Sequence, residues 1–170
     1  ATGSAEALLE IVSEVLDLAR LEYGDTSVEN RPFGIREVVR VLRFAVLPIA
    51  KQKRLELRFE LDDNLPKTVC GDPARIRQVL MNLVGNALKF TQQGQVVVSL
   101  KQLERGAEYV RLRIAVNDTG IGISEAQQQH IFDGFTQAEA STTRRFGGTG
   151  LGLVISKRLV ALMGGELQVQ

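Results

Sequence analysis

The chain of 170 residues has little of the chemistry on which many enzymes and metal proteins depend. Its single cysteine, Cys70, excludes an internal disulfide and a cysteine-rich metal site. Its single histidine, His130, is too little for a His-based zinc site or a Ser-His-Asp triad. Tryptophan is absent and aromatic residues make up only 5% of the chain, so the base-stacking surface of an RNA-binding module cannot be assembled.

Charge and hydropathy argue against two further classes of protein, those that bind nucleic acid and those that span a membrane. The net charge of +1 gives neither a basic field for nucleic acid nor an acidic field for a cationic partner. No apolar run approaches the roughly 20 residues that span a bilayer, and no signal peptide opens the sequence. A hydrophobic fraction of 44% is enough for a proper core. We therefore expect a soluble, cytoplasmic, reduced domain that makes no membrane contact of its own.

The stretch from Asp72 to Thr91 carries the strongest local pattern. Asp72 is a favoured N-cap and Pro73 a favoured first helical residue, so a helix is predicted to start there. One broad apolar face follows at helical spacing, made of Ile76, Val79, Leu80, Leu83, Val84 and Ala87.

A second, polar stripe runs along the same helix. It consists of Gln78, Asn82, Asn86 and Lys89, at steps of four, four and three, which point the same way. An asparagine oxygen is a hard ligand for Mg²⁺ and a lysine is a point charge for phosphate, so the stripe suits a cation with an anionic ligand. The stripe is equally typical of the solvated edge of an amphipathic helix, and this helix alone does not decide between the two.

The remaining elements predict an α+β fold, a two-layer α/β sandwich with helices on one face of a mixed, mainly antiparallel sheet and a helix in front. Helices are predicted over 5–22, 35–53, 124–132 and 151–163, and strands over 27–31, 55–61, 95–104, 109–116 and from 166 onward, with residues 68–71 a short bridge into the helix that starts at Asp72. Pro48 should kink or break its helix, and Ser124 with Gln127 has the spacing of a capping box. The apolar stripe of 5–22 is too wide for a lone surface helix and should need a packing partner.

Glycines gather in two places. The sequence Asp118-Thr119-Gly120-Ile121-Gly122 follows a strand, where a carboxylate can accept a hydrogen bond from a ligand amine while glycines let the backbone come close. An Asp-initiated turn with no ligand would have the same residues. Neither alternative is excluded by this segment alone.

The second cluster, residues 147–152, opens the last helix. Free N–H groups at a helix N-terminus after flexible glycines form a phosphate site, although the Walker loop and the Gly-x-Gly-x-x-Gly fingerprint are both absent. A lone glycine run is weak evidence. Arg144 and Arg145 before it could reach a phosphate, or could simply be solvated.

The four segments together resemble one known family. Residues 82–91, NLVGNALKFT, resemble the N box of the ATP-binding domain of sensor histidine kinases, in the wider family shared with gyrase, Hsp90 and MutL. Residues 118–122 resemble the G1 box, 131–137 the F box and 147–152 the G2 box, and residues 142–146 are similar to those of hybrid sensor kinases. The resemblance covers residues 31–170, with all four boxes in order at the family's spacing.

The resemblance implies ATP and Mg²⁺ as ligands. Asn86 would hold a Mg²⁺ that bridges the phosphates, Asn82 would support the same site, and Lys89 would touch phosphate. In the ATPase branches of the family a glutamate lies four residues before the metal asparagine and activates water. Asn82 occupies that position here, and because an amide cannot act as a general base, hydrolysis should be poor.

The other boxes would bind the base and the phosphates. Asp118 would accept from the adenine amine, with Gly120 and Gly122 making room for the ring. A lid over 135–143 would close above, and the backbone of 147–152 would wrap the phosphates; the positions implied are Arg145, Gly148, Thr149, Gly150, Leu151 and Gly152. No catalytic nucleophile or base is implied within the chain, because phosphoryl transfer rests on positioning and charge neutralisation.

The sequence departs from the family pattern in three respects. The F box has Asp133-Gly134 where Glu-Pro is usual, which should loosen control of the lid. The last strand is cut short. The phosphoacceptor motif is absent, since residues 5–22 resemble only part of the second helix of the dimerisation hairpin and His130 is expected to be structural or solvated. The chain should therefore bind ATP without phosphorylating itself.

We accordingly expect residues 1–24 to be the end of a dimerisation helix and 25–170 a catalytic domain from a membrane-anchored bacterial sensor. The expected activity is transfer of the γ-phosphoryl group of ATP to a histidine of a separate helical hairpin, with a receiver domain downstream. The alternative is a regulatory module that acts by binding another sensor kinase with little turnover. An ATP hydrolase is disfavoured by Asn82.

Overall fold

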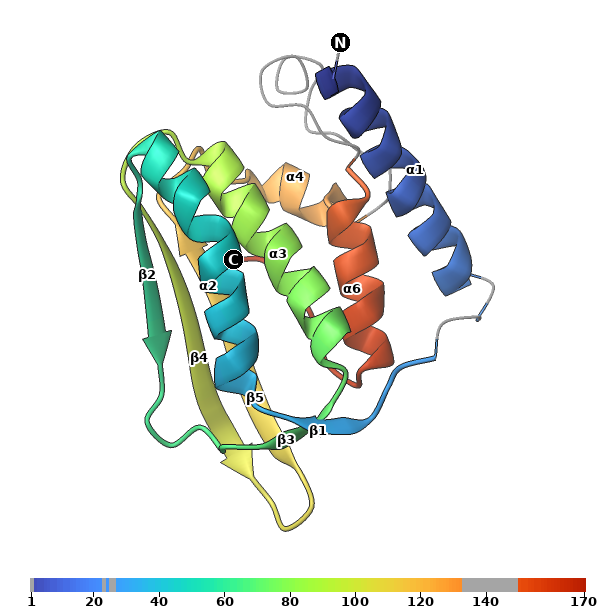
Figure 1. Cartoon of the computed structure of the whole chain (residues 1–170), viewed down its shortest axis with the longest axis vertical. Coiled ribbons are helices and arrows are strands. Elements are labelled where there is room, and N and C mark those ends of the chain that lie inside the picture. The colour runs from blue at the N-terminus through green and yellow to red at the C-terminus, as the bar shows by residue number, and fades with distance from the viewer. Residues whose placement is uncertain (1, 23, 25–26, 133–149) are drawn as a thin grey trace. The chain divides into compact units, whose positions relative to one another are not determined.

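A computed structural model describes residues 2–22, 24, 27–132 and 150–170. The chain divides into two compact units: one runs from Glu29 to Gly122, and the other combines Ala1–Val28 with Ile123–Gln170. Figure 1 labels the elements of each. The predicted boundary after residue 24 stays a prediction.

The unit from Glu29 to Gly122 is a two-layer sandwich. It contains β1 (Arg31–Phe33), α2 (Ile35–Lys53), β2 (Glu56–Leu61), β3 (Val69–Gly71), α3 (Pro73–Phe90), β4 (Gln95–Arg105) and β5 (Val110–Asp118). The main sheet has the order β2-β4-β5, with β2 parallel and β5 antiparallel to β4, and β1 pairs antiparallel with β3. The helices α2 and α3 cover one face of the main sheet (Figure 1). The mixed, mainly antiparallel α+β fold is confirmed.

The core of this unit lies between the helices and that sheet face. Successive side chains of a strand point to opposite faces, so only alternate residues of β4 are fully buried, namely Val96, Val98 and Leu100. They pack with a buried set from both helices: Val39, Leu42, Val46, Leu80, Val84 and Leu88. The predicted apolar face of 72–91 is thus the face of α3 that contacts the core.

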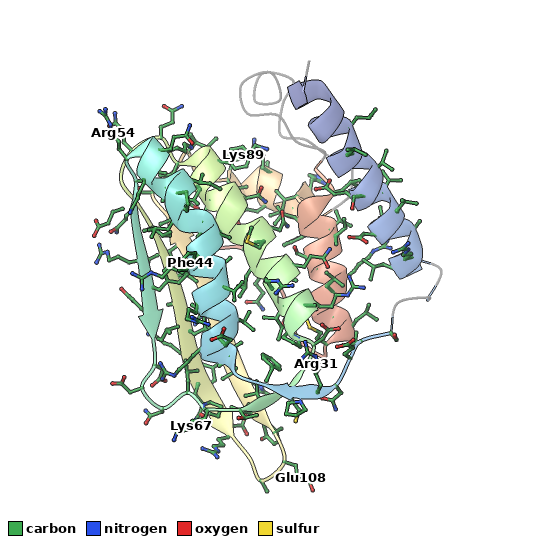
Figure 2. The ribbon with its side chains drawn as sticks, viewed as in Figure 1. Arg31, Phe44, Arg54, Lys67, Lys89 and Glu108 are labelled. Atoms are coloured by element: carbon green, nitrogen blue, oxygen red, sulfur yellow. The ribbon has the colours of Figure 1, made fainter. Side chains whose placement is uncertain are left out.

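Two predicted features of this unit are wrong. The early strand lies at Arg31–Phe33 rather than 27–31, because residues 31–33 are the ones that find a partner, in β3. The predicted break at Pro48 is also wrong, because α2 continues to Lys53, and the alternative of a kink at Pro48 stays a prediction. Because proline has no N–H, the carbonyl of Phe44, four residues earlier, loses its helical hydrogen bond. Phe44 lies on the outer face of the helix, where its side chain is 83% exposed, so water can replace that bond (Figure 2).

The unit that combines the two ends of the chain is helical in its described part. It contains α1 (Thr2–Glu22), α4 (Glu125–His130) and α6 (Gly152–Leu162), and α1 lies beside α6. The capping box is confirmed: Ser124 Oγ accepts from the Gln127 N–H at 3.3 Å, and Gln127 Oε1 accepts from the Ser124 N–H at 3.0 Å. Within the described residues, none of the helices combines the length and the apolar character that crossing a bilayer requires.

The ends of this unit bear on two further predictions. Along α1 several apolar side chains are exposed, including Leu8, Leu9 and Leu16, as expected for a stripe that needs a partner. The strand predicted from residue 166 is wrong, because residues 165–170 pair with none of the strands in the described part of the chain. An alternating pattern forms a strand only where a neighbouring strand offers hydrogen bonds.

Asp72 fixes the start of α3. Its Oδ1 accepts from the N–H groups of Ala74 at 3.1 Å and Arg75 at 3.0 Å, and its Oδ2 accepts from the N–H of Glu29 at 3.1 Å. Burial raises the pKa of this carboxyl group. The hydrogen bonds from Arg75, Glu29 and Ala74, with the charge of Arg75, outweigh burial and leave the pKa below its ordinary value.

Replacing Asp72 by alanine should lower the free energy of unfolding by about 2 kcal/mol at pH 7, because three N–H groups lose their acceptor. Since the pKa in the folded state lies below the unfolded value of about 3.9, the contribution of Asp72 is complete above that value and is lost as the pH falls through the folded pKa. Urea unfolding of both proteins between pH 7 and pH 3 measures this. The difference between them should begin to shrink as the pH falls below about 3.9, and a difference that grows in acid would contradict the assignment. The exposed Asp63→Ala is the control and should leave the free energy of unfolding at pH 7 unchanged.

Candidate functional site

The polar stripe of α3 is assembled as predicted over its last three members. Asn86 donates from Nδ2 to Oδ1 of Asn82 at 3.4 Å, so its own oxygen takes no part in that bond. Lys89 lies at the C-terminal end of α3, with Nζ 5.3 Å from the centre of the Phe90 ring (Figure 2). Gln78 instead accepts from the Arg75 guanidinium at 2.9 Å. The half-buried amides and the ammonium group thus share one edge of the helix.

The Asp118 turn closes the end of β5. Oδ1 of Asp118 accepts from the Gly120 N–H at 2.8 Å. A Cβ at Gly120 would lie 2.7 Å from that same oxygen and 2.8 Å from the carbonyl oxygen of Phe90, so only glycine fits. Gly122 has a φ of +71°, in the left-handed region that favours glycine. Both glycines are therefore required by the turn itself.

The end of α3 and the end of β5 meet through Thr91, whose importance the sequence did not reveal. Thr91 is fully buried, and its hydroxyl donates to Oδ1 of Asp118 at 3.5 Å. The available signal was weak: a small polar residue directly after the helix, with no pattern to say that it would be buried. Since both bonds to Asp118 use Oδ1, Oδ2 is the oxygen that an incoming amine would meet.

The third predicted segment lies in the other unit. Gly150 has a φ of +73°, Leu151 is fully buried, and α6 begins at Gly152. No side chain caps the N-terminus of α6 within the part of the chain that the structure describes. The lid (135–143), Arg145, Gly148 and Thr149 lie outside the described residues. The convergence of all four boxes on one ligand stays a prediction.

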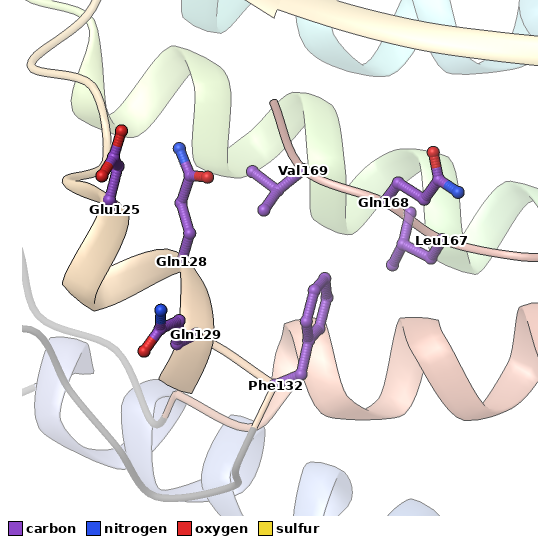
Figure 3. Close-up of a pocket in the computed structure, with 7 residues that line it drawn as sticks. All are labelled: Glu125, Gln128, Gln129, Phe132, Leu167, Gln168 and Val169. Atoms are coloured by element: carbon purple, nitrogen blue, oxygen red, sulfur yellow. The ribbon is translucent and has the colours of Figure 1, made fainter.

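A separate hollow lies in the unit formed by the chain ends. It has a volume of about 500 Å³ and lies between α4 and the last residues of the chain, with the Phe132 ring at its side (Figure 3). The ammonium of Lys157 lies 4.4 Å from the centre of that ring, on α6. Among the described residues that line the hollow, Glu125 alone has a charged side chain.

The described side chains offer few ligands for a metal ion, so a bound polyphosphate would have to supply the others. Among the described residues no group of three or more His, Cys, Asp or Glu side chains could hold a metal ion. Mg²⁺ usually keeps several waters and takes one or two protein ligands together with substrate phosphates, so the asparagine donor set of α3 fits this ion when a polyphosphate is bound. His130 is exposed at the end of α4.

Comparisons with known proteins agree with this arrangement. A family model described as "Histidine kinase-, DNA gyrase B-, and HSP90-like ATPase" matches residues 71–170. The sensor protein GacS of Pseudomonas syringae pv. syringae is 44% identical over 166 residues, which is 98% of this chain and 18% of that protein. The sensory/regulatory protein RpfC of Xanthomonas campestris pv. campestris is 42% identical over 97% of this chain and 23% of its own length. The chain thus spans about a fifth of the length of these relatives.

Solved structures share the fold. Full-length ShkA in complex with AMPPNP matches with a TM-score of 0.82 and 34% identity, over 95% of this chain and 32% of that one. The histidine kinase ThkA in complex with the response regulator protein TrrA matches with a TM-score of 0.71 and 27% identity, over 96% of this chain and 43% of that one.

Proposed function

Since this chain belongs to the family of histidine kinase-, DNA gyrase B- and HSP90-like ATPases, within its sensor histidine kinase branch, we propose that it binds Mg-ATP and passes the γ-phosphoryl group to a histidine outside this sequence. The observation that carries the proposal is the junction of α3 and β5. There, the Asn82–Asn86 pair and Lys89 precede a residue, Thr91, that is bonded to Asp118. One end of a helix therefore offers groups for phosphate and metal beside an acceptor for the base.

Asp118 is the proposed acceptor for the adenine amine. A carboxylate accepts but does not donate, so it distinguishes the exocyclic amine of adenine from the carbonyl oxygen that guanine has at the same position. The turn holds the carboxylate through its bonds to Gly120 and Thr91. Gly120 and Gly122 keep side chains away from the space beside it.

The phosphates are assigned to two helix ends. Lys89 would neutralise phosphate charge from the end of α3. The backbone of Gly150, Leu151 and Gly152, at the N-terminus of α6, would donate N–H groups to the phosphates. The remaining positions of this proposed phosphate loop are Arg145, Gly148 and Thr149.

Asn86 is the proposed Mg²⁺ ligand, with Asn82 holding its amide in place. Held there, the metal would supply positive charge that neutralises the phosphates. Asn82 and Asn86 cannot remove a proton from water, so we propose that transfer to an acceptor histidine is favoured over hydrolysis. In this proposal the chain accelerates transfer by positioning the nucleotide and by neutralising phosphate charge, and none of its side chains acts as a nucleophile or base.

The partners are proposals of the same kind. The acceptor histidine would come from a helical hairpin to which α1 contributes part of a helix, and a receiver domain would take the phosphoryl group next. The match to ThkA in complex with the response regulator protein TrrA supports the second partner. Residues 1–24 are then the end of the hairpin, 25–170 the catalytic domain, and the parent protein a membrane-anchored sensor.

A regulatory module that binds another sensor kinase is the second candidate. The Asp133-Gly134 sequence in the F box favours it, because lid control should be weaker than with the usual Glu-Pro. The two candidates share ATP binding and differ in turnover.

One pair of measurements tests the proposal. Saturating Mg-ATP at about 100 times its Kd should stabilise the fold by about 2.7 kcal/mol and raise the melting temperature by roughly 5–10 °C. Labelled ATP mixed with the chain and a sensor-kinase hairpin that carries a phosphoacceptor histidine should then label that histidine. Stabilisation without labelling would favour the regulatory module. If Mg-ATP gave neither stabilisation nor labelling, the proposed nucleotide site would be overturned. A hairpin with its histidine replaced by alanine is the control.

A further inference from the structure

Lys53 is the last residue of α2, and its side chain leaves that helix for another one. The helix ends because Arg54 adopts a left-handed conformation, with φ 57° and ψ 35°, and donates its N–H to the carbonyls of Ala50 and Lys51. This cap turns the chain away toward β2. The half-buried Lys53 side chain extends from this point to the C-terminal end of α3.

The ammonium group of Lys53 meets three carbonyl oxygens. It donates to Leu88, to Lys89 at 3.1 Å and to Thr91 at 2.9 Å. An ammonium group has three N–H donors, so the three acceptors satisfy it completely. A positive charge is also favourable at the C-terminus of a helix, where carbonyl dipoles point outward.

Three carbonyl groups of the last turn of α3 have a donor within the protein. The carbonyl of Ala87 accepts from the Thr91 N–H at 3.0 Å, and the carbonyls of Leu88 and Lys89 accept from Lys53. Helix ends fray when their carbonyls have only water. The end of α3 is instead held on one side by Lys53 and on the other by the Asp118 turn.

The residues that Lys53 holds are those of the proposed site. Lys89 offers its carbonyl to Lys53 while its side chain belongs to the polar stripe, and Thr91 offers its carbonyl to Lys53 and its hydroxyl to Asp118. Lys53 therefore bonds directly to the backbone of one residue proposed to bind phosphate, Lys89, and of one residue that contacts the proposed adenine acceptor, Thr91.

We propose that Lys53 is a positioning residue for the nucleotide. It keeps the last turn of α3, with Asn86 and Lys89, at a set distance from the Asp118 carboxylate, so that base and phosphates are bound at once. This inference rests on the nucleotide site proposed above. Lys53 touches no ligand in this role and acts through α3 and Thr91.

The test compares Lys53→Met with Lys51→Met. Lys51 is exposed on the same helix, so its substitution removes the same charge without removing the three bonds. Binding of ATP and of GTP is measured by calorimetry well below the melting temperature of each variant. Lys53→Met should weaken ATP binding roughly 10- to 100-fold and reduce the preference for ATP over GTP, since small displacements at a site have effects of that size. Lys51→Met should match the wild type, and Lys53→Arg, which keeps charge and several donors, should recover most of the affinity.

The outcomes separate this inference from the proposed function. A folded Lys53→Met protein with wild-type affinity and preference, beside an Asp118→Ala protein that no longer binds ATP, would overturn the role of Lys53 and leave the nucleotide site intact. Unchanged ATP binding in Asp118→Ala would overturn the site and the inference with it. If Lys53→Met does not fold, Lys53→Gln, which keeps two N–H donors without the charge, decides by the same comparison.

Discussion

Replacing Asp118 by alanine is expected to reduce ATP affinity by at least about 100-fold, which is the loss typical of a site built around one hydrogen-bonding group. The substitution removes the oxygen proposed to meet the adenine amine. It also leaves the N–H of Gly120 and the hydroxyl of Thr91 without the acceptor that both now use. Loss of the acceptor and relaxation of the turn act in the same direction.

Calorimetric titration with Mg-ATP measures the effect. Asn117→Ala is a matched control, because Asn117 is the exposed neighbour on the same strand and shares no hydrogen bond with the turn in the described structure. The ATP affinity of Asp118→Asn should lie between those of the wild type and Asp118→Ala, since the asparagine amide keeps one accepting oxygen. An Asp118→Ala protein that binds ATP as tightly as the wild type would refute the assignment of the adenine side.

Asn86→Asp should abolish ATP binding by a different route, with a loss of at least about 100-fold. In the present structure the Asn86 amide donates to Oδ1 of Asn82. A carboxylate cannot donate, so two oxygens would face each other at that position. The added negative charge would also lie beside the triphosphate, where it repels phosphate oxygens.

The measurement is ATP affinity with and without Mg²⁺. In the wild type, removal of Mg²⁺ with a chelator should weaken binding, whereas the variant should bind ATP weakly in both conditions because the added carboxylate repels the phosphates. Asn64→Asp makes the same chemical change in an exposed turn and should leave affinity unchanged. If Asn86→Asp kept wild-type affinity and Mg²⁺ dependence, the metal assignment would be wrong.

Much of the fold could be predicted because its signals are local. Three of these signals depend on residues within one turn or one strand of each other: the Asp72-Pro73 start of α3, the alternation of β2 and β4, and the capping box at Ser124. The polar stripe of α3 is also local, and the structure keeps Asn82 and Asn86 in contact. For these elements, propensity and packing agree.

The rest depends on contacts that no local pattern encodes. Lys53 lies in a run of cations and nothing distinguishes it from Lys51, yet its partners are 35 to 38 residues away. The burial of Thr91 is set by Asp118, and the position of β1 by β3. Residues 166–170 have a strand pattern but no neighbouring strand among the described residues. Long-range pairing decides such positions.

The order of strands in the main sheet has a consequence for how the chain folds. Val110 of β5 pairs with Arg105, only a tight turn away, whereas Glu56 of β2 pairs with Gln95 across the whole of β3 and α3. Closing a long loop has a larger entropic cost than closing a short one. We therefore expect the β4–β5 hairpin to form before β2 is added to the sheet. Substitutions that weaken the hairpin should then slow folding more than substitutions in β2 do, because the strand that closes the long loop would pair last.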